Sequence, residues 1–313
     1  MSWLVLISAP YLLPVVEEYR ARLEAEGVEI VTARVCERLS EAELLPLVAT
    51  IDGAICGDDQ FTERVLRAAP RLKAISKWGT GIDSIDTRAA ARLGIRVLNT
   101  PDAFTDAVAD TSIGYVLCFA RRLSWMDTHV RRGLWSKPDC VALSECTLGV
   151  VGVGHIGRAV VRRARACGMK VLGCDPVPVA PAFAKEHDLT MLPLHALLAA
   201  SDFVTLHCDL NSTTYHLIGR DELAFMRSTA YLINTSRGPV IDESALINAL
   251  SERLIAGAAL DVFEVEPLPK GSPLRLLENC LLAPHNANSS REARSRVHES
   301  TISNLIAALR EAQ

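Results

Sequence analysis

The stretch GVGHIG at residues 152–157 constrains the fold more than any other feature of the chain. Its three glycines have GxGxxG spacing and follow an apolar run, TLGVV (147–151). The segment after them reads as a helix with its apolar positions on one face. A second apolar run, KVLGCD (170–175), comes next and ends in Asp175. A strand, a glycine turn, a helix and a strand in this order predict a βαβ unit with parallel strands.

Each part of this unit suits the binding of a dinucleotide. Gly152 allows a tight turn, Gly154 lets the backbone approach a pyrophosphate, and Gly157 lets the helix pack on the strand. The helix N-terminus then faces the phosphates. Asp175 can accept hydrogen bonds from a ribose 2′-hydroxyl and would repel a 2′-phosphate, so NAD is the expected cofactor. Asp175 alone would also fit a turn before Pro176.

The rest of the chain alternates apolar runs with helical segments, which predicts an α/β protein with parallel sheets. The expected strands are 3–8, 28–31, 53–56, 72–76, 96–99, 147–152, 170–175, 203–208, 231–235, 255–262 and 280–284. The expected helices end at Gly27 or cover about 41–49, 62–69, 86–93, 106–122, 157–167 and 289–311, and a loop rich in Gly, Trp and Pro covers 133–140. We therefore predict two α/β halves, with the last helix crossing back to the first half.

Composition excludes several classes of protein. The chain has 313 residues, 49% of them hydrophobic, which suits two domains. Its net charge of −4 gives no sign of the positive surface that binds nucleic acid or a membrane. Its apolar runs are too short to cross a bilayer, and its N-terminus does not resemble a signal peptide. The nine cysteines are odd in number and form no CxxC, so we expect reduced thiols, a cytoplasmic protein and no metal site.

Three polar side chains follow successive strands in the second half: Arg237, Glu266 and His285. Ligands of open parallel sheets bind outside the carboxyl ends of the strands, so we expect all three in one crevice. Histidine can donate a proton to a reduced carbonyl, a glutamate beside it stabilises the imidazolium, and arginine grips a carboxylate. Alternatively, Arg237 and Glu266 form a structural ion pair and His285 is an ordinary loop residue. His207 also ends a strand and competes for the catalytic role.

Five segments resemble the D-isomer-specific 2-hydroxyacid dehydrogenase family, and the resemblance covers nearly the whole chain. They are GVGHIG with Asp175, LHCDLNSTTYHLI (206–218), NTSRGPVIDESAL (234–246), LDVFEVEPLP (260–269) and APHNA (283–287). The chain departs from the family pattern at Asn286, which replaces an apolar residue, at VADT (108–111), and at Asp209, which replaces a proline.

The resemblance implies a flavodoxin-like substrate-binding domain of residues 1–101 and 287–313 and a Rossmann dinucleotide-binding domain of residues 102–286. It also implies a homodimer joined through the nucleotide-binding domain. Arg237 would bind the carboxylate and carbonyl of the substrate, Glu266 would pair with His285, and His285 would be the acid and base. The implied contacts to NAD are Gly152, Gly154, His155, Ile156, Gly157, Asp175, His207, Thr235, Asp261 (at the nicotinamide carboxamide) and His285. The implied contacts to the substrate are Lys77, Thr80, Gly81 and Arg237.

The segment after the third strand bears on the substrate. Phosphoglycerate dehydrogenases usually carry an arginine there, whereas this chain has Asp58 and Asp59, which would repel a phosphate and could accept hydrogen bonds from substrate hydroxyls. Alternatively, the two aspartates lie in a solvated loop that caps the next helix. Lys77 favours a phosphate instead. We predict an unphosphorylated D-2-hydroxy acid or 2-keto acid of the hydroxypyruvate, glyoxylate or sugar-acid type. The alternatives are a D-3-phosphoglycerate dehydrogenase and, in another class, a non-enzymatic NADH-sensing protein like the corepressors of this fold.

Overall fold

The structure is a computed structural model that describes residues 2–312. The chain forms two compact units. The first extends to Phe104 and resumes at Ser290, and the second comprises Thr105–Ser289. Every strand pairing in both units is parallel, so the predicted α/β class is confirmed. The roles assigned to the two domains stay predictions.

The first unit contains a five-stranded sheet in the order β2-β1-β3-β4-β5, which is the flavodoxin-like order. Its strands are β1 (Trp3–Ile7), β2 (Val28–Thr32), β3 (Gly53–Cys56), β4 (Ala74–Lys77) and β5 (Arg96–Leu98). Its helices are α1 (Val16–Ala25), α2 (Glu41–Leu44), α3 (Glu63–Arg67), α4 (Thr87–Arg92) and α12 (Arg291–Glu311), with a 3-10 turn at Leu13–Val15. The predicted flavodoxin-like sheet is therefore present.

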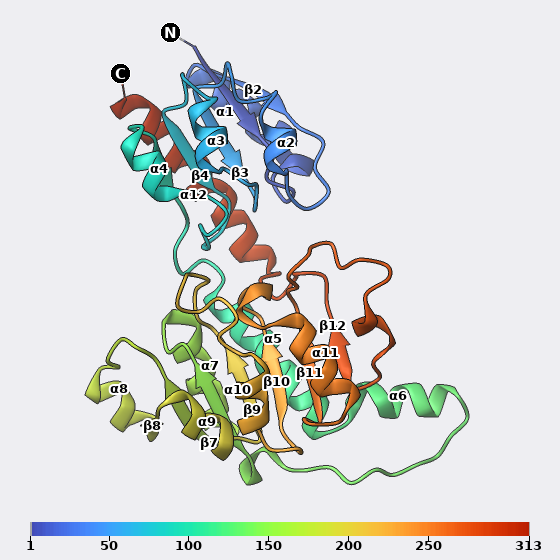
Figure 1. The fold of residues 1–313 in the computed structure, drawn as a ribbon. Coiled ribbons are helices and arrows are strands. Elements are labelled where there is room, and N and C mark those ends of the chain that lie inside the picture. Colours follow the sequence, from blue (N-terminus) through green and yellow to red (C-terminus); the bar gives the residue numbers. More distant parts are fainter. Residues whose placement is uncertain (1, 313) are drawn as a thin grey trace. The chain divides into compact units, whose positions relative to one another are not determined.

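Helix α12 returns to this first sheet, as the sequence predicted, and packs on β3, β4 and β5 (Figure 1). Ser290 caps its N-terminus by accepting a hydrogen bond from the Ala293 amide at 3.3 Å. A Cβ atom at Gly53 in β3 would lie 3.1 Å from Cδ1 of Leu305. The small residue in the strand thus lets the helix pack close to the sheet.

The second unit contains a seven-stranded sheet in the order β12-β11-β10-β9-β6-β7-β8. Its strands are β6 (Thr147–Val151), β7 (Lys170–Cys174), β8 (Leu189–Met191), β9 (Phe203–Leu206), β10 (Tyr231–Asn234), β11 (Gly257–Leu260) and β12 (Cys280–Leu282). Its helices are α5 (Thr105–Ala120), α6 (Leu123–Arg131), α7 (His155–Ala166), α8 (Pro181–Glu186), α9 (Leu194–Ala200), α10 (Arg220–Phe225) and α11 (Glu243–Ser251). Short 3-10 turns lie at Leu143–Glu145, Gly238–Val240 and Pro273–Leu276.

Two hydrophobic clusters sandwich this second sheet. Residues of α5 and α7 fill one face, and residues of α9, α10 and α11 fill the other (Figure 1). The strand order reverses between β6 and β9, so the carboxyl ends of these strands form the switch point where ligands of Rossmann folds bind. The predicted Rossmann architecture is confirmed.

The structure differs from the predicted elements in a few places. Helix α2 stops at Leu44 instead of about residue 49, because Pro46 cannot continue a helix. Helix α6 was not predicted, and none of its residues is buried in the structure. Strand β8 and helices α8 to α10 were likewise not assigned from the sequence, whereas α11 begins at Glu243, where the sequence predicts a helix start.

Candidate active site

The glycine motif forms an open cradle between β6 and α7. Gly152 has a φ of +89°, which favours glycine, and a Cβ atom on Gly157 would lie only 2.0 Å from the Gly152 carbonyl oxygen. A Cβ atom on Gly154 would meet nothing within 4 Å. The first and third glycines are therefore required by the protein itself, whereas the second leaves space at the N-terminus of α7. This arrangement fits the pyrophosphate of a dinucleotide.

Asp175 lies at the end of β7 beside this cradle. Its Oδ2 accepts a hydrogen bond from the Val153 amide at 2.6 Å, and its Oδ1 accepts one from the Val177 amide at 2.7 Å. The carboxylate is thus fixed to the glycine loop and to the turn after β7. An acidic group held at this place fits the ribose of NAD.

The turn after β10 presents Arg237. Asn234 organises this turn, because its Oδ1 accepts from the Ser236 amide at 3.0 Å and its Nδ2 donates to the Arg237 carbonyl oxygen at 2.9 Å. The half-buried guanidinium donates to the Ser236 carbonyl oxygen at 3.0 Å. A Cβ atom on Gly238 would lie 1.9 Å from the carbonyl carbon of Phe263, so this turn packs directly on the segment that leads to Glu266. Asn234 was not predicted to have this role, although an asparagine at a strand end is a typical turn signal.

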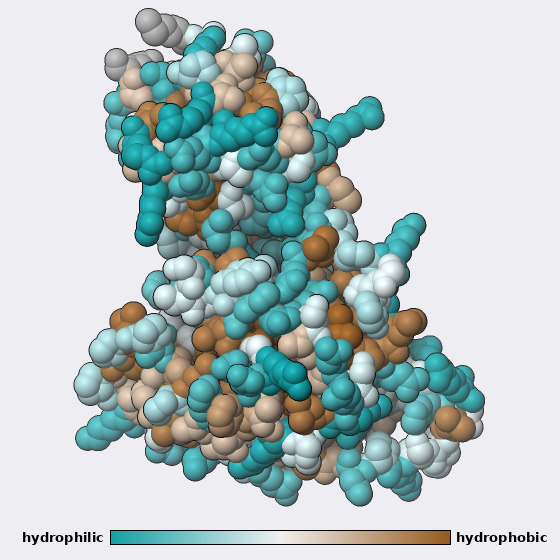
Figure 2. All heavy atoms as spheres, viewed as in Figure 1, coloured by the Kyte–Doolittle hydropathy of each residue, from teal (hydrophilic) through white to brown (hydrophobic). Residues whose placement is uncertain are grey.

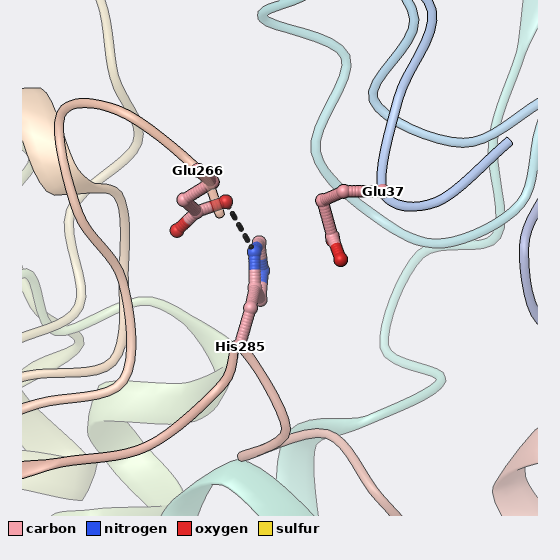
Figure 3. Close-up of side chains that lie close together, drawn as sticks. All are labelled: Glu37, Glu266 and His285. Atoms are coloured by element: carbon pink, nitrogen blue, oxygen red, sulfur yellow. Dashed lines mark hydrogen bonds and ion pairs between the residues drawn. The ribbon is translucent and has the colours of Figure 1, made fainter. Parts of the chain in front are cut away.

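Glu266 and His285 form a hydrogen bond, as predicted. The distance between His285 Nδ1 and Glu266 Oε2 is 2.9 Å, and the two side chains are 20% and 13% exposed (Figure 3). The other carboxylate oxygen of Glu266 accepts from the Phe263 amide at 2.9 Å. His285 has a φ of +47°, an uncommon conformation for a side chain of this size, and its amide donates to the Asp261 carbonyl oxygen at 2.8 Å.

Asp261 holds the loop that carries His285. Its buried carboxylate accepts hydrogen bonds from the amides of Asn286 and Ala287, each at 2.9 Å. Burial raises the pKa of Asp261, while these amides and the neighbouring His285 lower it. The predicted contact of Asp261 with a nicotinamide carboxamide stays a prediction. Asn286 enters this arrangement through its backbone, and its side chain is exposed.

His207 has a different character from His285. Its Nε2 lies 2.9 Å from Oγ1 of Thr205, and its buried Nδ1 has no hydrogen-bond partner within residues 2–312. Burial lowers the pKa of His207 to about 3, so its ring is neutral near pH 7. A general acid at neutral pH needs a proton to give, so this environment disfavours His207 in that role. Thr235, another predicted cofactor contact, lies at the end of β10 with Oγ1 3.1 Å from Oγ of Ser112.

The predicted substrate loop belongs to the first unit. The Thr100 amide donates to the Gly79 carbonyl oxygen at 2.9 Å, and Thr80 Oγ1 donates to the Thr100 carbonyl oxygen at 3.0 Å. The backbone around Thr80 and Gly81 is therefore fixed by the chain after β5. Lys77, which ends β4, is buried and forms an ion pair with Asp58 at 3.2 Å.

The prediction that Asp58 and Asp59 meet the substrate, or else lie in a solvated loop, is wrong for Asp59. Its carboxylate is fully buried and accepts hydrogen bonds from the Ser8 hydroxyl and, at 2.6 Å, from the Leu39 amide. Thr62, not an aspartate, caps the following helix α3. Asp59 thus links its own loop to the segments that contain Ser8 and Leu39.

Comparison with known proteins agrees with this geometry. Residues 113–287 match the family model described as the NAD binding domain of D-isomer specific 2-hydroxyacid dehydrogenases. A glyoxylate reductase of Korarchaeum cryptofilum is 42% identical over 279 residues, which are 87% of this chain and 81% of that protein. A D-3-phosphoglycerate dehydrogenase of Methanocaldococcus jannaschii is 39% identical over 269 residues, 85% of this chain but only 51% of that longer protein.

The solved structures show the same likeness over the full length. The crystal structure of a D-lactate dehydrogenase from Aquifex aeolicus, in complex with NAD and lactic acid, superposes with a TM-score of 0.88 at 28% identity. The match covers 98% of this chain and 96% of that one. The chain belongs to the D-isomer specific 2-hydroxyacid dehydrogenase family, and it is an NAD(P)-dependent 2-hydroxyacid dehydrogenase.

Proposed function

We propose that this enzyme uses NADH to reduce short 2-keto acids without a phosphate, such as glyoxylate and hydroxypyruvate, to D-2-hydroxy acids. The observation that carries the proposal is the hydrogen bond between Glu266 and His285, on the same sheet edge as the glycine cradle. The relatives named above support the substrate class, since a glyoxylate reductase is 42% identical to this chain.

We assign the transfer of the proton to His285. Glu266 engages Nδ1, so proton exchange with the substrate falls to Nε2. In the direction of reduction, the imidazolium gives this proton to the carbonyl oxygen, and in oxidation the neutral ring accepts a proton from the hydroxyl group. Glu266 stabilises the imidazolium and fixes the ring plane, and it is itself held by the Phe263 amide.

Arg237 is the residue we assign to the substrate carboxylate. A guanidinium can bind a carboxylate through two parallel hydrogen bonds and can polarise the adjacent carbonyl group. Asn234 and the close contact of Gly238 with Phe263 fix the turn that carries Arg237, so its position is set by the backbone. Thr80 and Gly81, in the loop after β4, are the further contacts to the carboxylate that the resemblance implies.

The cofactor would be held by the glycine cradle, with the ribose on Asp175 and the contacts of His155, Ile156, His207, Thr235 and Asp261 along the sheet edge. When bound, NADH supplies the hydride. A 2′-phosphate would meet the fixed negative charge of Asp175, so we propose a preference for NAD over NADP.

Turnover tests this proposal directly. Purified enzyme is mixed with NADH and with glyoxylate, hydroxypyruvate, pyruvate or 3-phosphohydroxypyruvate, and NADH absorbance is followed. We expect the first two to give the highest kcat/KM, and His285→Ala to lower kcat by about 10²-fold or more. His195→Ala, which changes an exposed histidine on α9, serves as the control. Absence of turnover with every keto acid would favour the NADH-sensing alternative, and a preference for the phosphorylated acid would favour a phosphoglycerate dehydrogenase.

We further propose that the enzyme is a homodimer joined through α6 and the loop that follows it. Apolar side chains in this region are largely exposed, and Trp135 reaches 82%. Figure 2 shows hydrophobic side chains at the surface here, among mostly hydrophilic neighbours. A second copy of the chain would cover them. Sedimentation of the native enzyme should give a dimer, and Trp135→Asp should shift it toward the monomer.

We place the enzyme in the cytoplasm. All nine cysteines are free thiols, which suits a reducing compartment. No helix within residues 2–312 combines the length and the hydrophobicity that a bilayer crossing requires.

A further inference from the structure

We infer that the buried ion pair between Asp58 and Lys77 selects against phosphorylated substrates, because it neutralises the ammonium group beneath the substrate loop. This inference rests on the proposed function, since it specifies which keto acids the proposed site accepts. Asp58 would then be a specificity-determining residue, and Lys77 would support the loop instead of gripping the substrate.

The sheet of the first unit brings the two residues together. Strands β3 and β4 are neighbours, and Cys56 pairs with Lys77 in their register. Asp58 lies in the loop two residues beyond the end of β3, and Lys77 is the last residue of β4. The loop after β3 therefore lies beside the carboxyl end of β4. The Lys77 side chain is 5% exposed and the Asp58 side chain 25% exposed, with 3.2 Å between Nζ and Oδ1.

Lys77 also forms a hydrogen bond with the backbone of the substrate loop. Nζ donates to the Trp78 carbonyl oxygen at 3.2 Å and lies 3.7 Å from the place that a Cβ atom of Gly79 would occupy. Trp78 is anchored in turn, because its Nε1 donates to Nδ1 of His298 on α12 at 3.0 Å. The ammonium group thus sits under the backbone of residues 78–79 as part of the loop's internal support.

The charges decide what this loop can accept. A phosphate group on the substrate carries one to two negative charges and needs a cation whose charge is not already compensated. Asp58 compensates the charge of Lys77, and the pair is buried enough to be little screened by salt. A keto acid with a neutral hydroxyl tail does not need an uncompensated cation at this place. The pair therefore favours glyoxylate and hydroxypyruvate over their phosphorylated counterpart.

Four proteins separate the possibilities by the charge of the pair itself, while the neighbouring Asp59, which also acts on Lys77, is the same in all four. The native pair has a charge of zero, Asp58→Asn leaves +1, Lys77→Met leaves −1, and the double variant returns to zero. For each, we compare kcat/KM for 3-phosphohydroxypyruvate with kcat/KM for hydroxypyruvate. We expect Asp58→Asn to raise this ratio by about tenfold or more, the double variant to return near the native ratio, and Lys77→Met to fall below it. An unchanged ratio in Asp58→Asn, or a double variant that keeps the raised ratio, would overturn the inference.

A second measurement does not depend on turnover. Reductive methylation followed by peptide mass spectrometry should modify Lys77 far more slowly than the exposed Lys137 and Lys270 in the native enzyme. Lys77 should become more reactive in Asp58→Asn. Equal labelling of all three lysines in the native enzyme would refute the buried pair. If the native enzyme reduces neither glyoxylate nor hydroxypyruvate, the proposed function fails, while the labelling still decides whether Asp58 holds Lys77.

Discussion

Two single-methyl substitutions in the glycine motif should have opposite effects, because one glycine faces the protein and the other faces the ligand. A Cβ atom on Gly157 would lie 2.0 Å from the Gly152 carbonyl oxygen and 3.4 Å from Cγ1 of Val150. The oxygen belongs to the backbone and cannot rotate away. Gly157→Ala must therefore open this approach to more than 3.0 Å, which moves the start of α7 away from the turn after β6.

The costs can be compared. Overpacking of a well-filled site typically costs about 1–3 kcal/mol, and a rigid backbone contact puts Gly157→Ala at or above the upper end. For a domain of this size, that lowers Tm by roughly 6–12 °C. Gly154 has a φ of −75°, which alanine adopts readily, and its Cβ atom would meet nothing within 4 Å. Gly154→Ala should therefore change the free energy of unfolding by less than about 1 kcal/mol.

Ligand binding should show the reverse order. The open space above Gly154 is where the pyrophosphate would approach, and a methyl group there would force it away from the α7 amides. We expect Gly154→Ala to raise the Kd for NADH by about tenfold or more, equivalent to about 1.4 kcal/mol. Thermal unfolding followed by circular dichroism measures the first effect, and titration of NADH fluorescence measures the second. Native NADH affinity in Gly154→Ala, or a native Tm in Gly157→Ala, would refute this reading of the cradle.

Three further predictions concern charged groups of the second unit. Asp175→Ala should weaken the preference for NAD over NADP by about tenfold or more, measured as the ratio of the two Kd values; a native enzyme without a preference would contradict the role of Asp175. Arg237→Lys keeps the charge but loses the planar fork, so kcat/KM should fall by about 10²-fold; a near-native value would argue for a structural arginine. Burial lowers the pKa of His207 to about 3, so the unfolded chain binds a proton there before the folded one does. The neutral His207 ring therefore costs no stability above about pH 6.5. Below that pH the free energy of unfolding falls by about 1.4 kcal/mol per pH unit until the pH nears 3. Urea unfolding between about pH 6 and pH 4 should therefore show a smaller loss of stability in His207→Gln than in the native enzyme, and equal losses would contradict the buried neutral ring.

The sequence predicted the fold well where the signal was local. Apolar runs separated by helical stretches located every strand of both sheets except β8, and GVGHIG located the turn between β6 and α7. These features depend on residues close together in the chain, whose period and turn chemistry are visible without a structure. Helix α6 was not predicted, because it directly follows the helix expected over 106–122 and none of its residues belongs to the buried core.

One side-chain pairing of the candidate site could be predicted from the sequence, and another could not. The hydrogen bond between Glu266 and His285 could be expected from their places after neighbouring strands. The pairing of Lys77 with Asp58 could not, because it depends on how two loops fold over the end of the first sheet. The environment of His207 is a similar case, since burial sets its pKa and burial comes from distant segments. In both cases contacts between distant segments of the chain set the environment of a titratable group.

The three carboxylates of the second unit's site share one arrangement: each accepts hydrogen bonds from backbone amides of the loops at the carboxyl ends of the strands. Asp175 holds the glycine loop, Asp261 holds the loop of His285, and Glu266 is held by the segment before it. A backbone amide cannot change rotamer. These hydrogen bonds therefore fix the functional groups in positions that the strands of the sheet determine. The loops at this edge of the sheet therefore need few hydrogen bonds between side chains to stay rigid. Hydride transfer requires donor, acceptor and acid to meet within a narrow range of distances, and a site built on strand ends supplies that precision from the sheet itself.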